Sequence, residues 1–243
     1  MIKFYQDKFD SEALGRKVFK LYLDRSINNE KDLLSIFNQH QIDIIFCFTA
    51  FFNKNIAILE KLNFSLVSLR NTYKFSSSIV ARAVKPDNRF KILQYTKDRP
   101  KIARSDILGL AKVIGSTSRY FHDINIPKNL AHHLYVKWIE NSLDDKYADE
   151  SFCVLLKNKL IGLATLRIKD GDGFIDLLSV NSAYQGRGLG SILVRRAVEY
   201  CKNKKVNNIF VVTEGENLAA NIFYQKRGFI INKIELAYHK HFL

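Results

Sequence analysis

Apolar and polar positions alternate, or recur at helical spacing, along most of the chain. The alternation predicts strands at 174–180 and 208–213, and the positions between them predict a helix that runs to about Lys202. A further helix is expected at 217–224. The remaining elements lie upstream: a strand at 89–96, helices at 102–114 and 127–143, and a hairpin of strands at 151–156 and 160–168. The series predicts an α/β fold with a mixed sheet (α+β).

The turn after the strand at 174–180 has the chemistry of an anion site. It reads QGRGLG at 185–190, and a helical pattern begins there. Gly188 and Gly190 let the backbone approach an anion, and the helix directs its free N–H groups and positive dipole end toward it. We therefore expect this loop to hold a pyrophosphate.

Two other kinds of phosphate loop fit these residues less well. A Walker loop ends in Gly-Lys-Ser/Thr, but Gly190 is followed by Ser191 and Ile192. A dinucleotide fingerprint that starts at Gly186 requires glycine at position 191, although Glu214 stands where a ribose-binding acid would belong. A nicotinamide cofactor is therefore not expected.

Three features in sequence order resemble the GNAT superfamily of acetyl-CoA-dependent N-acetyltransferases. They are the glycine loop at 185–190, an Asn-to-Tyr helix at 217–224 and a Gly-Phe turn at 228–229. The resemblance implies that the loop amides hold the pyrophosphate of CoA, that the preceding strand hydrogen-bonds its pantetheine arm, and that Tyr224 protonates the leaving thiolate. The residues implied to hold acetyl-CoA are Leu178, Ser179, Val180, Gln185, Gly186, Arg187, Gly188, Leu189, Gly190, Asn217 and Ala220.

Acetyl transfer from a thioester to an amine makes three demands on a site. The carbonyl must be polarised, the amine must be neutral, and the departing thiolate must receive a proton. Backbone N–H groups around Leu178–Val180 suit the first task, and the phenol of Tyr224 suits the third as a general acid. For the base, the sequence leaves Asp123, Glu140, Asp176 or a chain of water molecules open.

The first part of the chain contains a weaker repeat of the last part. Residues 45–49 parallel residues 209–213, and Asn53 takes the place of Asn217. The first part has no glycine loop, and Glu60 lies where a tyrosine would be needed for catalysis.

A turn-rich break at 84–88 divides the two parts. We predict that residues 84–243 form a catalytic GNAT domain, because their element order is that of a complete one. Residues 1–83 are predicted to form a truncated, non-catalytic GNAT-like domain that packs beside it and covers the acceptor side.

Two segments carry a clue to the acceptor. Residues 118–123 and 134–142 resemble segments of the dTDP-fucosamine acetyltransferase family within the GNAT superfamily, and residues 8–15 resemble its opening segment. The resemblance implies acetylation of the 4-amino group of a nucleotide-linked dideoxy sugar used in a surface polysaccharide. The residues implied to contact this substrate are Arg119, Phe121, Trp138 and Glu140. Arg119 suits a bidentate contact with a diphosphate, but a solvated arginine and core packing of Trp138 are equally open.

The chain of 243 residues carries a formal net charge of +14, which favours an anionic partner. Acetyl-CoA and a sugar nucleotide both meet this demand. The sequence has no dense basic block and no arginine–aromatic RNA pattern, so a nucleic-acid partner is not expected. Two alternatives stay open: a GNAT enzyme that acetylates a protein N-terminus or a small amine, and an acetyl-CoA-binding regulatory module, which would not need Tyr224 as a proton donor.

Cysteines and histidines give two further expectations. Cys47, Cys153 and Cys201 lie in apolar segments without pairing spacing, so we expect reduced thiols and a cytoplasmic protein. The histidines show no metal-ligand spacing with cysteine or carboxylate residues, so no metal is expected. No secretion signal is visible at the N-terminus, and the apolar stretch 42–52 is too short to span a bilayer. Whether the chain forms a homodimer is left open.

Overall fold

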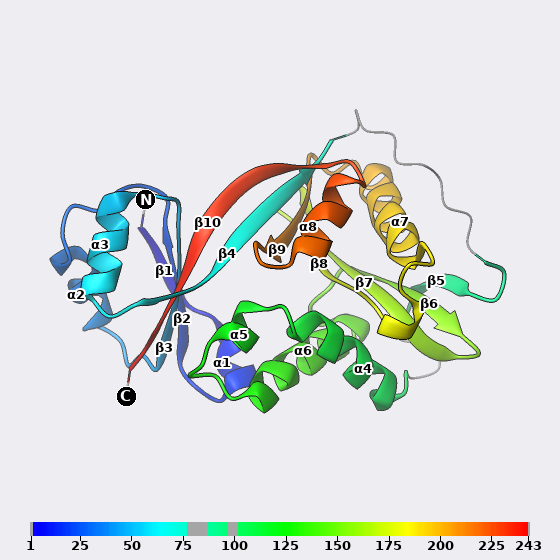
Figure 1. Ribbon diagram of the computed structural model, residues 1–243, viewed down its shortest axis with the longest axis horizontal. Helices are drawn as coiled ribbons and strands as arrows, with labels where there is room; N and C mark the ends of the chain where they lie inside the picture. Colours follow the sequence, from blue (N-terminus) through cyan, green and yellow to red (C-terminus); the bar gives the residue numbers. More distant parts are fainter. Residues whose placement is uncertain (1, 77–86, 97–101, 243) are drawn as a thin grey trace.

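The computed structural model describes residues 2–76, 87–96 and 102–242. Within them, ten strands form one mixed sheet, and helices cover parts of both faces (Figure 1). The strands are β1 (Ile2–Gln6), β2 (Val18–Leu23), β3 (Ile44–Thr49), β4 (Ser65–Phe75), β5 (Lys91–Tyr95), β6 (Glu150–Leu156), β7 (Lys159–Lys169), β8 (Asp172–Val180), β9 (Ile209–Glu214) and β10 (Phe229–His241). The helices are α1 (Lys8–Leu14), α2 (Lys31–Phe37), α3 (Asn53–Lys61), α4 (Arg104–Gly115), α5 (Arg119–His122), α6 (Lys128–Leu143), α7 (Leu189–Asn203) and α8 (Leu218–Gln225).

These elements confirm the α/β fold with a mixed sheet that the sequence predicts. The predicted strands and helices from residue 89 onward appear within a few residues of their expected bounds. The short helix α5 was not predicted; Ser118 caps it, since its side chain accepts a hydrogen bond from the N–H of Phe121. Residues 84–86 of the predicted break lie outside the described residues.

The first and last parts of the chain exchange strands in the sheet. The strand order is β1-β2-β3-β10-β4-β9-β8-β7-β6-β5. Strand β4 thus lies beside β9, and β10 crosses to lie beside β3. The two exchanged strands pair with each other as a long antiparallel ribbon that joins the two ends of the molecule (Figure 1). The two predicted domains therefore share one sheet, and their division stays a prediction.

The sheet register agrees with the proposed internal repeat. Cys47 and Val211 occupy equivalent positions in the repeat, in β3 and β9. Cys47 is paired with Tyr238 of β10, and Val211 is paired with Tyr73 of β4. Both tyrosines are almost fully buried, so the exchanged strands bring equivalent aromatic side chains to equivalent places.

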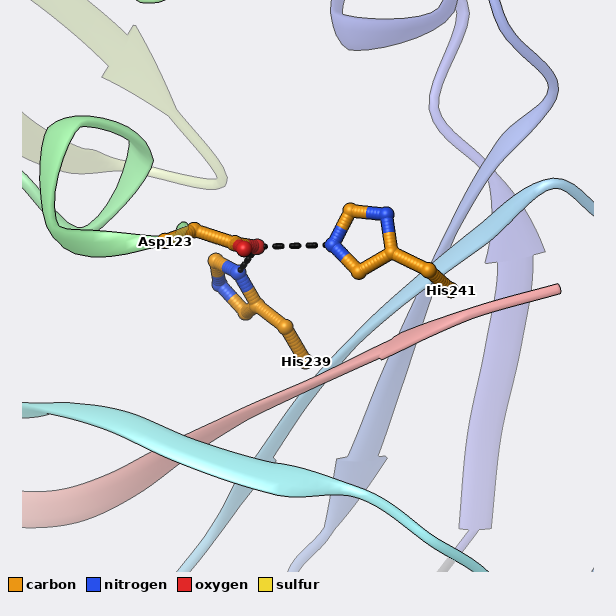
Figure 2. Close-up of side chains that lie close together, drawn as sticks. All are labelled: Asp123, His239 and His241. Carbon is orange, nitrogen blue, oxygen red and sulfur yellow. Dashed lines mark hydrogen bonds and ion pairs between the residues drawn. The ribbon is translucent and has the colours of Figure 1, made fainter. Parts of the chain in front are cut away.

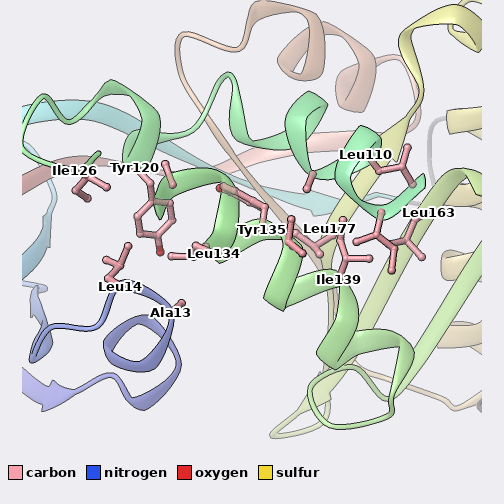
Figure 3. Packing of buried hydrophobic residues seen from close by; sticks show 14 of the residues in the cluster. Ala13, Leu14, Leu110, Tyr120, Ile126, Leu134, Tyr135, Ile139, Leu163 and Leu177 are labelled. Atoms are coloured by element: carbon pink, nitrogen blue, oxygen red, sulfur yellow. The ribbon is translucent and has the colours of Figure 1, made fainter. Parts of the chain in front are cut away.

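Helices α4 and α6 pack on one face of the sheet, and α7 packs on the other. In β7, Leu163 belongs to the core beneath α4 and α6, whereas the next residue, Ala164, belongs to the core beneath α7. Successive side chains of a strand point to opposite faces, which explains the alternation. Leu110 and Ile139 lie near Leu163 and Leu177 in the first core (Figure 3). In the described part of the chain, no helix has both the length and the apolar character needed to cross a membrane.

Candidate active site

Strands β8 and β9 lie parallel but pair only at their first residues. On β8 the paired positions are 173–175. From there to Val180, β8 pairs only with β7 among the described strands, so one edge of its backbone is open. Leu178, Ser179 and Val180 line a cavity at this edge. An open strand edge can hydrogen-bond an extended ligand as an added strand would.

A glycine-rich turn follows β8 and leads into α7. Gly186 and Gly188 have φ values of 75° and 77°, in the left-handed region that favours glycine. Gly188 is the N-cap of α7 and has no side chain to cap the helix, so N–H groups of the first turn are available to an anion. The Gln185 side chain donates a hydrogen bond to the Val180 carbonyl over 3.0 Å and holds the turn against the end of β8. The whole predicted loop lines the cavity: Gln185, Gly186, Arg187, Gly188, Leu189 and Gly190.

Gly190, in the first turn of α7, lies against α8. A Cβ atom at this position would lie 3.4 Å from the ring of Phe223 on α8. The space that the missing side chain leaves therefore faces a neighbouring helix. Gly190 thus adds to the close packing of α7 and α8, and its part in holding a pyrophosphate stays a prediction.

Asn217 is the N-cap of α8. Its Oδ1 accepts a hydrogen bond from the N–H of Ala220 over 3.1 Å, and its Nδ2 donates to Thr117 Oγ1 over 3.0 Å. The side chain therefore caps a helix and ties it to the loop between α4 and α5. Asn217 and Ala220 both line the cavity, and their contact with acetyl-CoA stays a prediction.

Tyr224 lies on α8 and lines the same cavity. Its ring packs among Tyr73, Phe223 and Phe229, at centroid distances of 6.2, 5.4 and 5.7 Å respectively. Burial raises the pKa of the phenol above its usual value, so the group keeps its proton at neutral pH. A protonated phenol in this position is suited to donate a proton to a leaving thiolate.

Of the three carboxylates considered as a base, Asp176 lines the cavity, and Asp123 and Glu140 do not. Burial raises the pKa of Asp176 to about 6, against the opposing effect of Arg167. Arg167 donates a hydrogen bond to Oδ1 of Asp176 over 3.0 Å. A carboxyl group with this pKa is ionised at neutral pH and is basic enough to accept a proton from an amine.

A β-bulge accompanies Asp176 in β8. The register between β7 and β8 shifts at this point, so that Ile175 and Leu177 lie opposite consecutive residues of β7. In a regular strand these two flanking residues would share one face. Here Ile175 enters the core beneath α7, and Leu177 enters the core beneath α4 and α6. The bulge thus changes the face of the sheet to which the side chains of β8 point, at the place where Asp176 lines the cavity.

The cavity has a volume of about 1580 Å³. Pockets for one small ligand usually have about 300–1,000 Å³, so this space can take two substrates. Its wall extends from the loop at 185–190 to Tyr5 and Tyr22 in β1 and β2. Basic side chains outnumber acidic ones in the lining: Lys3, Lys20, Arg70, Arg119, Arg167, Lys169, Arg187, Arg227 and Lys233, against Asp7, Asp10, Asp24, Asp176, Glu214 and Glu235.

Sequence comparison finds a family match and several relatives. Residues 119–229 match the model of the acetyltransferase (GNAT) family. The chain is 23% identical over 133 residues to the spore coat polysaccharide biosynthesis protein SpsD of Bacillus subtilis (strain 168), which covers 55% of this chain and 46% of SpsD. It is 26% identical over 113 residues to streptothricin acetyltransferase A of the same strain, which covers 44% of this chain and 65% of that enzyme. The chain thus spans less than two thirds of the length of either relative.

The fold is similar to that of a GCN5-related N-acetyltransferase from Sphaerobacter thermophilus. The two superpose with a TM-score of 0.61 at 9% identity, over 99% of this chain and 76% of the other. Residues 119–229, close to half of the chain, thus belong to the GNAT family of acetyltransferases. The predicted superfamily is therefore confirmed, and GNAT enzymes use acetyl-CoA. The closer resemblance to dTDP-fucosamine acetyltransferases stays a prediction, because SpsD is a distant relative.

Two of the four predicted acceptor residues face the GNAT cavity. Arg119 and Trp138 line it, whereas Phe121 and Glu140 do not. Phe121 stacks on His132 of α6, and Glu140 forms an ion pair of 3.7 Å with Arg104 of α4. Residues two apart on a helix point about 200° away from each other around its axis. Trp138 and Glu140 therefore point in nearly opposite directions, as do Arg119 and Phe121, and the contact of these four residues with an acceptor stays a prediction.

Arg119 joins the first part of the chain to the last part through a polar network. It forms an ion pair with Glu214 at 3.5 Å and donates to the hydroxyl of Tyr120 over 2.5 Å. Tyr120 donates to Asp10 over 3.1 Å, and Asp10 pairs with Lys20 at 3.1 Å. Burial disfavours the charge of Arg119, but Tyr120 and Glu214 outweigh it and hold its pKa above the usual value. The guanidinium is therefore a fixed positive charge at the cavity wall.

Asp123 belongs to a cluster that the sequence did not reveal. Its Oδ2 lies 2.6 Å from Nδ1 of His239 and 2.8 Å from Nε2 of His241 (Figure 2). Burial would raise the pKa of Asp123, but the two hydrogen bonds outweigh it and hold the pKa below its usual range. The carboxylate is therefore engaged and poorly suited to act as the base. The available signal was the His-x-His pair in a strand, but its carboxylate partner is 116 residues away from His239.

Proposed function

We propose that this GNAT protein transfers the acetyl group of acetyl-CoA to the amino group of a nucleotide-linked amino-dideoxy sugar. One observation carries the proposal: a single cavity contains the open edge of β8, the glycine loop, Tyr224 and a polar wall from the first part of the chain. The first three features suit a CoA thioester. The fourth suits a second substrate that is polar and anionic.

Acetyl-CoA would bind with its pyrophosphate at the N-terminus of α7 and its pantetheine arm along β8. Backbone N–H groups of Leu178–Val180 would polarise the thioester carbonyl. Asp176 would accept a proton from the ammonium form of the acceptor, directly or through water. The neutral amine then attacks the carbonyl and the C–S bond breaks. Tyr224 would protonate the departing thiolate and regain a proton from the second amine hydrogen through solvent.

The wall opposite the glycine loop supports a sugar nucleotide as the acceptor. Arg70, Arg119 and Lys20 supply positive charge for a diphosphate. Tyr5 and Tyr22 stack at 6.3 Å between ring centroids on the same wall and offer aromatic faces to a base or sugar ring. The relative SpsD, a spore coat polysaccharide biosynthesis protein, agrees with this acceptor class.

We also propose that residues 1–83 act as a non-catalytic half that closes the acceptor side. Strands β2 and β3 pair along all their six positions, 18–23 against 44–49. In its described residues this half therefore lacks the separation between parallel strands that opens an edge of β8. Cys47 and Cys201 are buried free thiols, which supports a cytoplasmic location for the protein.

Mass spectrometry of a panel of acceptors incubated with acetyl-CoA and the full chain tests the proposal. The panel holds dTDP- and UDP-linked amino sugars, the free amino sugars, peptides with free N-termini and small polyamines. We expect acetylation of a nucleotide-linked 4-amino sugar and a much slower reaction of the free sugar. If free and conjugated sugars react equally, or if peptides or polyamines are preferred, the sugar-nucleotide proposal fails and the GNAT assignment is unaffected.

A further inference from the structure

Asp123, His239 and His241 form a compact cluster outside the acetyl-transfer cavity (Figure 2). We propose that these three residues bind one divalent transition-metal ion and that zinc is the ion their ligand set fits best. The proposal does not depend on the acceptor of acetyl transfer. It concerns a second site, at the junction of helix α5 with the C-terminal strand of the shared sheet.

Two chain segments bring suitable ligand atoms together. His239 and His241 are two residues apart on β10, so the period of the strand directs both to one face. Asp123 reaches them from the C-terminal end of α5. One ligand atom from each residue lies within 4.8 Å of the others. Two imidazoles and one carboxylate are a ligand set typical of zinc sites with three protein ligands.

The observed distances are close to those that an ion requires. The carboxylate oxygen lies 2.6 Å from the nitrogen of His239 and 2.8 Å from that of His241. Zinc bound at about 2.0–2.2 Å holds tetrahedral ligands roughly 3.3 Å apart. An opening of about 0.5–0.7 Å therefore makes room for the ion. Small rotations of the three side chains can supply this movement without any change in the backbone.

The unpaired nitrogens of the two rings also suit a metal. Metal ligands must be neutral imidazoles and ionised carboxylates. His239 Nε2 and His241 Nδ1 are buried and have no hydrogen-bond partner among the described residues. No direct contact there fixes a tautomer, so each ring can carry its proton on the outer nitrogen and turn a lone pair toward the ion.

A bound ion would connect the site to the cavity. The N–H of Asp123 donates to the carbonyl of Arg119 over 3.0 Å, across the single turn of α5. The ion would thus tie the helix that positions Arg119 to β10. The positive charge of Arg119 lies near His239 and opposes a cation, whereas the carboxylate of Asp123 supplies the attraction. We therefore assign the ion a structural role in holding α5 against the sheet.

The test uses the full chain, stripped with a chelator, dialysed and titrated with zinc against a chromophoric competitor. We expect one zinc ion per chain and a thermal unfolding midpoint that rises with zinc concentration. His241→Gln and Asp123→Asn should each weaken binding by more than about 10-fold, since even the loss of an outer-shell partner typically costs 10–100-fold. His122→Gln is the matched control, because this exposed histidine lies next to Asp123 but outside the cluster, and it should bind zinc as the unaltered chain does.

Cobalt substitution keeps the proposal testable if a variant fails to fold. Cobalt bound to the unaltered chain should show the absorption of a tetrahedral site with nitrogen and oxygen ligands and no thiolate charge-transfer band. Three results would overturn the proposal: no stoichiometric zinc binding, equal affinity in a folded His241→Gln variant, or a thiolate band that assigns the ion to a cysteine.

Discussion

Replacing Tyr224 by phenylalanine separates the chemistry of the phenol from the packing of its ring. The ring has neighbours at 5.4 Å (Phe223) and 5.7 Å (Phe229), and phenylalanine keeps both contacts. Burial raises the pKa of Tyr224, and no charged or hydrogen-bonding neighbour contributes to the shift. Removal of the hydroxyl therefore leaves no partner unpaired among the described residues. We therefore expect the free energy of unfolding to change by less than about 1 kcal/mol. Truncation to alanine would instead cost about 3–5 kcal/mol, because it leaves a cavity in the core.

The effect on turnover should be far larger than the effect on stability. A positioned general acid typically contributes about 10²–10⁴-fold to the rate, which corresponds to about 3–5 kcal/mol of transition-state stabilisation. Acetyl-CoA affinity should be unchanged, since the loop and β8 bind the cofactor through the backbone. The assay follows the release of free CoA thiol with the best acceptor of the panel, and calorimetry gives the affinity for acetyl-CoA.

Tyr184→Phe is the matched control for this substitution. Tyr184 lines the same cavity beside the glycine loop, and its variant should keep the turnover of the unaltered chain. A Tyr224→Phe protein with unaltered kcat would refute the reasoning and leave water as the donor to the thiolate. A loss of acetyl-CoA affinity that accounts for the whole defect would refute it as well, because the phenol would then be a binding group.

Three further predictions follow from the site. The pKa of Asp176 near 6 predicts that kcat/KM rises with pH up to about 6 and levels off above it, because the base acts in its ionised form. Asp176→Asn should remove this rise at acid pH. An unchanged rise in the variant would exclude Asp176 as the base. Gly190→Val should lower the free energy of unfolding by about 1–3 kcal/mol through its clash with Phe223, whereas Gly190→Ala should leave this free energy nearly unchanged. Equal unfolding midpoints for the two variants would contradict the packing role of Gly190. Arg119→Lys keeps the positive charge beside Glu214 but loses the planar guanidinium group that can bind a diphosphate through two hydrogen bonds. The KM for the sugar nucleotide should therefore rise while the KM for acetyl-CoA stays constant. Parallel changes in both KM values would count against a contact of Arg119 with the acceptor.

Local features of the sequence determined much of the cofactor half. The glycine turn, the strand before it and the helix after it follow from residue types and periodicity within about 30 residues, so they are predictable without a fold. The same holds for the helix at Asn217, whose capping side chain bonds within its own first turn. Local features did not indicate that Gly190 also packs against Phe223, because that neighbour comes from another helix.

Only the tertiary structure decided which distant residues share a site. The exchange of β4 and β10 brings the first part of the chain to the cavity, and no local propensity encodes the choice between one pairing partner and another. A bulge in β8 accompanies Asp176 where it meets the cavity, and the crossing of β10 brings His239 within hydrogen-bond distance of Asp123. Such contacts depend on the packing of whole elements, whereas sequence periodicity reports only the face to which a side chain points.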